Sequence, residues 1–160
     1  MRRLRAYADD DHAACVTVAR SNAPDYVLPD EVEAYAGWLE RACGSEASDD
    51  RCDYLVVEDE AGTVVACGGI AFAETANVAT LCWGLVRNDL HRTGLGTLLV
   101  QTRLAMARAR RVDEVLLDTS QHTTAFFARF GFRITSTTTD GYGPGLHRHD
   151  MALRLARGPG

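Results

Sequence analysis

Residues 85–102 read LVRNDLHRTGLGTLLVQT, and the rest of the chain is best understood outward from this stretch. An apolar run ends in charged residues, two glycines follow at Gly94 and Gly96, and an apolar pattern with helical spacing then begins. The pattern predicts a strand that passes into a helix through a glycine-rich turn. Three interpretations of the turn stay open: a phosphate site, a plain turn, or a feature without chemistry.

A helix N-terminus suits an anion because its first amide groups have no partner within the helix and carry a partial positive charge. Glycines directly before the helix let the chain adopt positive φ and let a ligand approach the backbone. His91, Arg92 and Thr93 add donors beside the glycines, so the turn suits a pyrophosphate. Glycines that serve only close packing of a strand-to-helix turn are the alternative.

Two familiar phosphate motifs do not fit this turn. A P-loop requires Gly-Lys-Ser/Thr, and all 17 Lys and Arg residues of this sequence are arginine. The dinucleotide fingerprint requires a third glycine three residues after the second, and that position is Leu99.

A third pattern does fit. The segment HRTGLGTLL at 91–99 follows ATLCWGLVRND at 79–89 and precedes TTAFFARFGF at 123–132. Together they resemble the GNAT superfamily of N-acetyltransferases, whose hallmark is Q/R-x-x-G-x-G/A after a strand and a downstream helix similar to A-x-x-F-Y-E-K-L-G-F. His91 replaces the usual Gln or Arg, while Gly94 and Gly96 match. The resemblance covers roughly residues 54–155 and is loose over the first fifty.

The resemblance implies an α/β (α+β) fold with a mixed, mostly antiparallel twisted sheet, flanked by helices. A central pair of parallel strands would splay at the cofactor site, and the strand–helix–strand order of residues 80–119 agrees with a parallel pair. We expect a single acetyltransferase domain over 1–160, comprising a strand and variable helices in 1–50, a cofactor-binding core in 53–119, and a helix and hairpin in 120–155.

Periodicity and turn residues predict the individual elements. A hairpin is expected over 53–74, with its turn at 60–62. Single strands are expected at 2–8, 79–86, 114–119, 132–139 and 148–155. A turn-rich segment at 140–147 separates the last two strands. Expected helices lie within 9–24, 29–44, 94–110 and 123–130, the last closed by Gly131.

In proteins of this family the loop holds the pyrophosphate of coenzyme A, and the pantetheine arm lies along the preceding strand like an added strand. The resemblance therefore implies acetyl-CoA as co-substrate, with a backbone N–H near Val86 stabilising the oxyanion. Ser120 occupies a position often filled by a cofactor-contacting Asn. The implied cofactor residues are Leu85, Val86, His91, Arg92, Thr93, Gly94, Leu95, Gly96, Thr97, Ser120 and Phe127.

The reaction implied by the resemblance is direct attack on the thioester by a primary amine of a small molecule or protein. The amine must lose a proton, since alkyl amines titrate near ~10.4, whereas a thiol with a pKa of about 8.5 leaves tolerably as thiolate. The family often supplies a Tyr acid where this chain has Phe127, and a Glu base on the strand that here reads ATLCWGLV. Phe127 indicates a different acid or none, because a general acid contributes only about 10²–10⁴-fold. The strand without an acid leaves the general base open.

Glu74 and His147 are the candidate catalytic residues. Glu74 is otherwise a solvated hairpin residue, His147 is otherwise an exposed loop histidine, and a water chain is a further route for the proton. Trp83 and Tyr142 are candidate substrate contacts, although Trp83 also suits the core.

Composition excludes several classes of protein. A net charge of −5 without a basic run argues against nucleic acid, and no apolar run reaches the roughly 18 residues of a membrane span. Without a signal-like start, we expect a cytoplasmic location. The five cysteines lack a C-x-x-C pair, which predicts no metal and reduced, mostly buried thiols, most clearly Cys82.

Two other functional classes remain open on the sequence: a catalytically silent acyl-CoA-binding or regulatory domain, and a structural domain without a cofactor. Members of the family are often dimers, so the resemblance also allows a homodimer.

Overall fold

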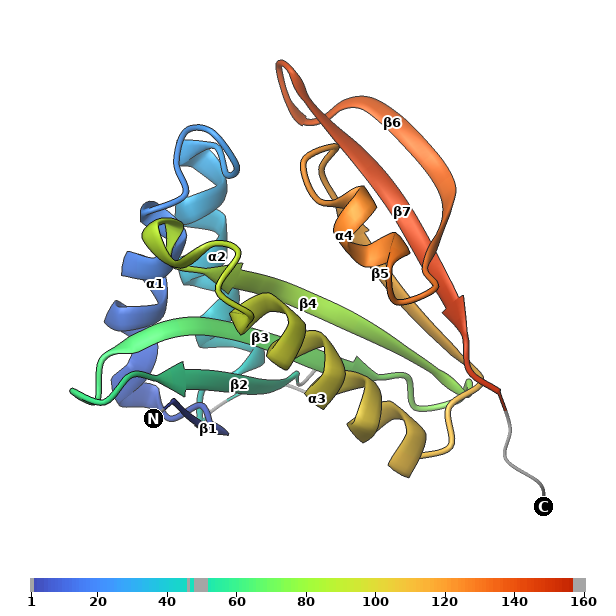
Figure 1. The fold of residues 1–160 in the computed structure, drawn as a ribbon, viewed down its shortest axis with the longest axis horizontal. Coiled ribbons are helices and arrows are strands. Elements are labelled where there is room, and N and C mark those ends of the chain that lie inside the picture. The colour runs from blue at the N-terminus through green and yellow to red at the C-terminus, as the bar shows by residue number, and fades with distance from the viewer. Residues whose placement is uncertain (1, 46, 48–51, 157–160) are drawn as a thin grey trace. The chain divides into compact units, whose positions relative to one another are not determined.

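The computed structural model describes residues 2–45, 47 and 52–156. Within these residues, seven strands form one mixed sheet in the order β1-β2-β3-β4-β5-β7-β6, with helices packed against it (Figure 1). The strands are β1 Arg3–Ala6, β2 Asp53–Glu58, β3 Val64–Phe72, β4 Val78–Val86, β5 Glu114–Thr119, β6 Arg133–Gly143 and β7 Leu146–Arg154. The helices are α1 His12–Arg20, α2 Pro29–Ala42, α3 Leu95–Ala109 and α4 Thr124–Ala128, with short 3-10 turns η1 Asp9–Asp11 and η2 Asn88–Leu90. The expected fold class, mostly antiparallel with one parallel pair, is confirmed.

Packing divides the chain into two compact units, which are described separately. The first comprises Met1–Ala71 and Cys82–Arg103, and the second comprises Phe72–Leu81 and Leu104–Gly160. The backbone of β4 and of α3 runs from one unit into the other. Among the described helices, none is both long and apolar enough to cross a membrane.

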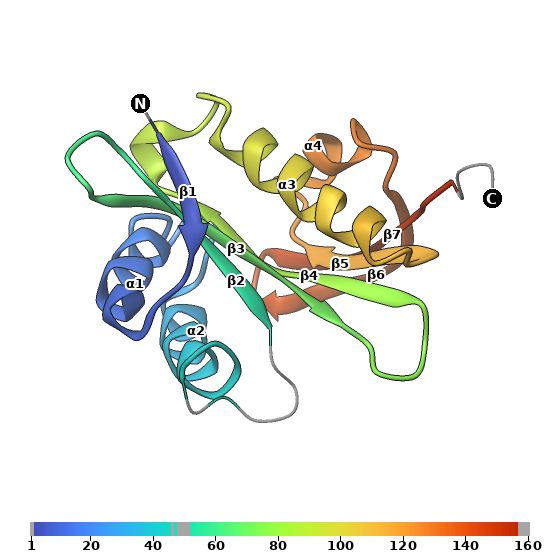
Figure 2. The same cartoon turned by 90° about the horizontal axis from the view of Figure 1, so that it is seen from below.

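In the first unit, β1, β2 and β3 form antiparallel ladders, with Leu4 opposite Val57 and Val57 opposite Ala66. Alternate β2 residues face opposite sides, as the pleat of a strand requires. Val56 therefore joins the core beneath α1 and α2, and Val57 joins the core beneath the start of α3. Figure 2 shows α1 and α2 on one side of these strands and α3 on the other.

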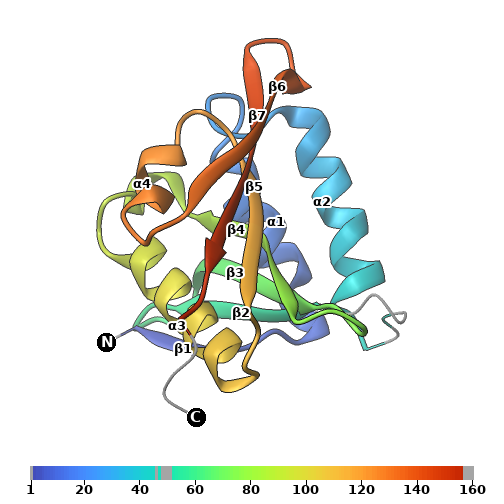
Figure 3. The same ribbon diagram turned by 90° about the vertical axis from the view of Figure 1, so that its right-hand side faces the viewer.

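In the second unit, β4 and β5 pair in parallel from Val78 opposite Glu114 to Thr80 opposite Leu116. The parallel strand–helix–strand arrangement expected for residues 80–119 is thus confirmed. Strand β7 lies between β5 and β6 and is antiparallel to both (Figure 3).

Two local expectations were wrong. The turn expected over 140–147 is much shorter, because β6 continues to Gly143 and β7 begins at Leu146. Positive φ values at Asp140, Gly143 and Gly145 let the hairpin absorb a register shift there.

The second wrong expectation concerns Cys82, which is half-buried rather than the clearest buried cysteine. It lies on the opposite face of β4 from the buried residues Ala79 and Leu81, since side chains alternate along a strand. Cys15, Cys52 and Cys67 are buried, and all five cysteines are free thiols.

Candidate functional site

The glycine-rich turn leads from β4 through η2 into α3 (Figure 1). Arg92 and Gly94 have φ values of +64° and +92°, which turn the chain into the helix. The amide of Leu98 donates to the carbonyl of Gly94 at 3.0 Å, so the helical ladder starts at Gly94. The amides of residues 95–97 consequently have no partner within the helix.

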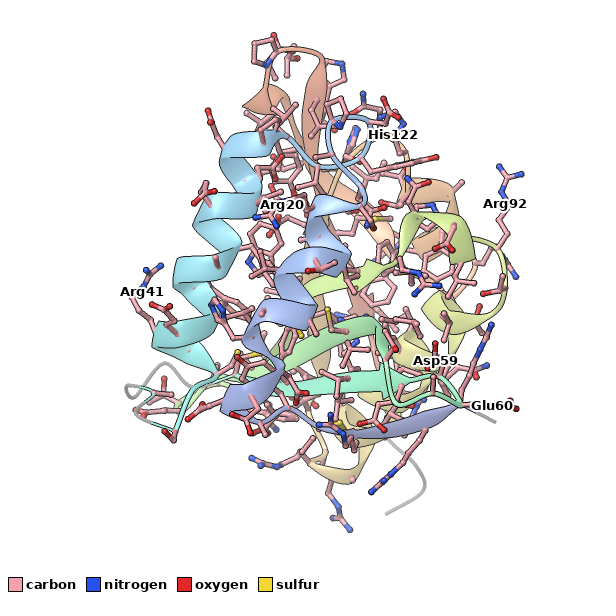
Figure 4. The ribbon with its side chains drawn as sticks, turned by 90° about the vertical axis from the view of Figure 1, so that its left-hand side faces the viewer. Arg20, Arg41, Asp59, Glu60, Arg92 and His122 are labelled. Carbon is pink, nitrogen blue, oxygen red and sulfur yellow. The ribbon has the colours of Figure 1, made fainter. Side chains whose placement is uncertain are left out.

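The space beside Gly94 is open. No atom lies within 4 Å of the position that a Cβ on Gly94 would occupy. The side chain of Arg92 is exposed and extends outward from the loop, as Figure 4 shows. The turn thus presents a helix N-terminus and a nearby guanidinium to solvent.

The helix start itself is firmly held. Leu95 and Leu99 are 0% and 1% exposed and pack on Val57 and Val65. Across the turn, the hydroxyl of Thr93 donates to the carbonyl of Leu90 at 2.6 Å. The amides of residues 95–97 are therefore fixed in space before any ligand arrives.

The carbonyl of Val86, at the end of β4, accepts two side-chain hydrogen bonds. Asn22 Nδ2 donates to it at 2.9 Å, and His91 Nε2 donates to it at 3.0 Å. A carbonyl oxygen has two lone pairs, so both are used here. His91, expected to contact the cofactor, therefore secures the strand that precedes the loop.

Some main-chain groups at the end of β4 point away from β3. The amide of Arg87 donates to the carbonyl of Val65 on β3 at 2.9 Å. Because the hydrogen-bonding direction alternates along an extended antiparallel strand, the carbonyl of Gly84 and the main-chain groups of Val86 point away from β3. Gly84 is exposed, while Leu85 is 8% exposed and buried in the core.

Trp83 precedes Gly84, and the structure shows one of the two roles that the sequence left open, that of a core residue; its role as a substrate contact stays a prediction. It is half-buried, with its ring 5.0 Å from that of Tyr35 and 6.5 Å from that of Trp38, so it forms part of the core. Its φ of +38° lies outside the extended region, and we call this feature the Trp83 kink.

Two expected cofactor residues, Ser120 and Phe127, lie in the second unit. Ser120 is 9% exposed, and its hydroxyl accepts a hydrogen bond from the amide of His122 at 3.3 Å. The Phe127 ring is half-buried against Phe126 and Phe132, with centroids at 5.1 and 5.9 Å. Both residues therefore make contacts that support the structure of the second unit.

The candidate catalytic residues also lie in the second unit. Glu74 is exposed in the connection between β3 and β4, two residues beyond Phe72. His147 Nδ1 accepts a hydrogen bond from the amide of Asp140 at 3.0 Å, so a neutral ring carries its hydrogen on Nε2. Proton acceptance by His147 therefore requires this contact to open.

Tyr142, the candidate substrate contact in the last hairpin, donates its hydroxyl hydrogen to a carboxylate oxygen of Asp118. Asp118 lies opposite Asp150 in the β5–β7 ladder, and Arg148 lies 3.6 Å from one carboxylate and 3.0 Å from the other. Arg148 offsets the repulsion between the paired acids, and their attraction raises its pKa through the hydrogen bond with Asp150 first.

The first unit thus brings together Trp83, Leu85, Val86 and residues 91–97. Sequence reasoning missed three residues that support them: Asn22, Tyr54 and Arg103. Arg103 had a usable signal, since it continues the four-residue spacing of Leu95 and Leu99 and is 2% exposed. Asn22 and Tyr54 act through contacts with residues distant along the chain, so the sequence around them gives no signal of their roles.

Comparisons with known proteins agree with this geometry. A sequence model of the acetyltransferase (GNAT) family matches residues 9–132. The structure of an acetyltransferase assigned to the GNAT family from Desulfovibrio desulfuricans superposes with a TM-score of 0.79 at 16% identity, covering 98% of this chain and 100% of that chain.

Two further structures have the same fold. The ribosomal-protein-S18-alanine N-acetyltransferase from Escherichia coli gives a TM-score of 0.76 at 18% identity, covering 99% of this chain and 97% of that chain. A GCN5-related N-acetyltransferase from Kribbella flavida gives 0.71 at 21% identity, covering 96% and 98%. The fold is that of an acetyltransferase, and the chain belongs to the GNAT acetyltransferase family.

Proposed function

We propose that this chain is an acetyl-CoA-dependent N-acetyltransferase that moves the acetyl group directly to a primary amine. The observation that carries the proposal is the N-terminus of α3, where Gly94 has positive φ and open space at its Cβ position, and where the amides of residues 95–97 have no partner within the helix. Membership of the GNAT acetyltransferase family supports the same reaction class.

The pyrophosphate of the co-substrate would lie on the amides of residues 95–97. The partial positive charge of a helix N-terminus attracts an anion there, and the exposed Arg92 adds a full charge. Because Leu95 is buried and holds the helix in place, these amides need no reorganisation to bind.

The pantetheine arm would pair with the carbonyl of Gly84 and with the amide of Val86, which point away from β3. Both lone pairs of the Val86 carbonyl are already used by Asn22 and His91, so that oxygen is not offered to the arm. An amide of the same stretch would then stabilise the oxyanion that forms when the amine attacks the thioester. Ser120 and Phe127 stay predicted cofactor contacts.

The reaction needs a base for the amine and a route for the proton to the sulfur. Glu74 is exposed to solvent, and His147 must first lose its hydrogen bond from the amide of Asp140 before Nδ1 can accept a proton. Phe127 carries no proton, so the sulfur leaves as thiolate or takes its proton from water. Proton exchange with solvent is therefore the route we favour.

The acceptor class follows from the fold only in outline. A neighbour of similar fold is named for acetylating an alanine of ribosomal protein S18, so a protein amine belongs in any screen beside small amines. We propose no nucleic-acid, membrane or metal partner. A cytoplasmic location and a homodimer stay predictions.

The test is to incubate the purified protein with acetyl-CoA and a panel of amino acids, polyamines, amino sugars and peptides with free N-termini. Released CoA should be followed by chromatography rather than by a thiol reagent, because Cys43 and Cys82 are only half-buried. Turnover on one class supports the proposal.

Binding is measured separately by thermal unfolding. Coenzyme A at a hundred times its dissociation constant should add about 2.7 kcal/mol to the free energy of unfolding. Stabilisation without turnover on a broad panel would favour a silent acyl-CoA-binding domain, and no stabilisation would favour a domain without this cofactor.

A further inference from the structure

The Trp83 kink lies directly before the main-chain groups that we assign to the acyl arm. A non-glycine residue with positive φ is strained and persists only where its surroundings hold it. Gly84, the next residue, has an exposed main chain. The direction of its amide therefore depends on what fixes the carbonyl of Trp83.

Tyr54, on β2, fixes that carbonyl. Its hydroxyl donates to the oxygen of Trp83 at 2.7 Å, and the residue is only 4% exposed. Burial raises the pKa of this hydroxyl well above its ordinary value, so it keeps its hydrogen and stays a donor. The ring reaches this place because Gly69 lacks a side chain: a Cβ there would lie 2.7 Å from Tyr54 Cδ2.

The hydrogen bond belongs to a chain whose direction is fixed. A carbonyl only accepts, so the single hydroxyl hydrogen of Tyr54 is committed to Trp83. The hydroxyl of Tyr35, 2.7 Å from that of Tyr54, must then donate to it. The thiol of Cys67, 3.3 Å from the Tyr35 oxygen, donates in turn. Hydrogen bonds aligned in this way polarise and strengthen one another.

A second side chain supports the kink from the α3 side. Arg103 is 2% exposed, and its Nη1 donates to the carbonyl of Gly69 at 3.2 Å. Its Nη2 lies 3.1 Å from the position of a Cβ on Gly84, so a side chain there would push the guanidinium aside. The strand at Gly84 is consequently held by a hydroxyl from one face and a guanidinium from the other.

We propose that Tyr54 is a positioning residue for acyl transfer, holding the carbonyl of Trp83 so that the amide of Gly84 meets the thioester oxygen. This inference rests on the proposed function, since it assigns the place of the thioester. Tyr54 itself touches neither substrate, and its effect passes through the backbone.

Tyr54→Phe tests the inference, with Tyr35→Phe as its matched control. Each variant removes one buried hydroxyl from the same chain, but only the first frees the Trp83 carbonyl. We expect similar losses of thermal stability in both. In Tyr54→Phe we expect kcat to fall about ten-fold with the KM for acetyl-CoA within about two-fold, because displaced catalytic geometry lowers the rate and not binding at the loop. Tyr35→Phe should keep kcat within about three-fold, as an indirect loss of polarisation implies.

Hydrogen–deuterium exchange gives a readout independent of activity. Peptides covering residues 82–87 should exchange about five-fold faster in Tyr54→Phe than in the wild type, as expected for the loss of one hydrogen bond. The same peptides should be unchanged in Tyr35→Phe.

The outcomes separate the two proposals. If the wild type turns over and both variants lose kcat and protection equally, Tyr54 is only a packing residue and the inference is overturned. If the wild type transfers no acetyl group to any amine, the proposed function fails, and the exchange data alone still decide whether Tyr54 holds the kink.

Discussion

Two neighbouring regions of the first unit use glycine for opposite reasons. Gly94, in the loop before α3, has a φ of +92° and no atom within 4 Å of its Cβ position. Gly69, on β3 beside the Trp83 kink, would bring a Cβ within 2.5 Å of Cys52 Sγ and 2.7 Å of the Tyr54 ring. The space beside Gly94 is open, whereas the space beside Gly69 is filled by packed side chains.

The difference follows from what each region is proposed to do. An anion is bound by backbone amides, so the loop needs exposed main chain and room for a ligand. An acyl group must be held in one place, so the strand needs a main chain fixed by packed neighbours. A substitution at Gly94 should therefore reduce ligand binding, whereas one at Gly69 should reduce the stability of the fold.

The largest effect is expected for Gly69→Ala. The new methyl group meets a buried sulfur and a buried ring that cannot both move, and such overpacking should cost about 3 kcal/mol of folding free energy. Urea unfolding measures this. Gly37→Ala on α2 is the control: its Cβ meets only the end of the Arg41 side chain, so stability should stay equal or rise. Equal behaviour of the two variants would contradict the packing difference.

Gly94→Glu should leave the fold intact and reduce affinity for coenzyme A at least about a hundred-fold, because it places bulk and negative charge at the amides. Calorimetric titration measures this. Gly62→Glu is matched in backbone, with a φ of +80° and open space in the turn between β2 and β3. It carries the same strain and charge, and its affinity should equal that of the wild type. Unchanged affinity in Gly94→Glu would sink the assignment of the loop.

Asn22→Ala should have a smaller effect on both regions. It removes a donor to the Val86 carbonyl and a donor to the Val18 carbonyl. His91 and Ser21 still donate to these oxygens, so the cost should be about 1–2 kcal/mol. We expect a modest rise in the KM for acetyl-CoA, measured by initial rates. Asn77→Ala, in the exposed connection between β3 and β4, should change neither quantity. A rate loss in Asn22→Ala without any change in KM would show that the Asn22–Val86 hydrogen bond serves the Trp83 kink rather than the loop.

The smallest effect is expected for Phe127→Tyr. The ring keeps its contacts with Phe126 and Phe132, so stability and affinity for coenzyme A should be unchanged. We expect kcat within about three-fold, because a thiol with a pKa of about 8.5 leaves as thiolate without help. An increase of a hundred-fold or more would show that protonation of the sulfur limits the wild type.

Local sequence patterns predicted most of the fold. The switch from an apolar run to helical spacing at Gly94 placed β4 and α3 within a residue or two of their observed bounds. The last hairpin was predicted less well, because Asp140, Gly143 and Gly145 resemble a loop in sequence and in fact lie in and beside a strand pair with shifted register. Turn residues alone do not distinguish an irregular hairpin from a long loop.

The sequence by itself determined the order of elements, the turn before α3 and the resemblance to the family, because these depend on residues within a few positions of each other. Only the tertiary structure decided that Asn22 and His91 donate to the Val86 carbonyl. The same holds for the carbonyls of Trp83 and Gly69, which accept from Tyr54 and Arg103. Each of these contacts joins side chains to backbone through the packing of separate elements. A hydrogen bond depends on the distance and angle between donor and acceptor, and the separation of two residues along the sequence determines neither.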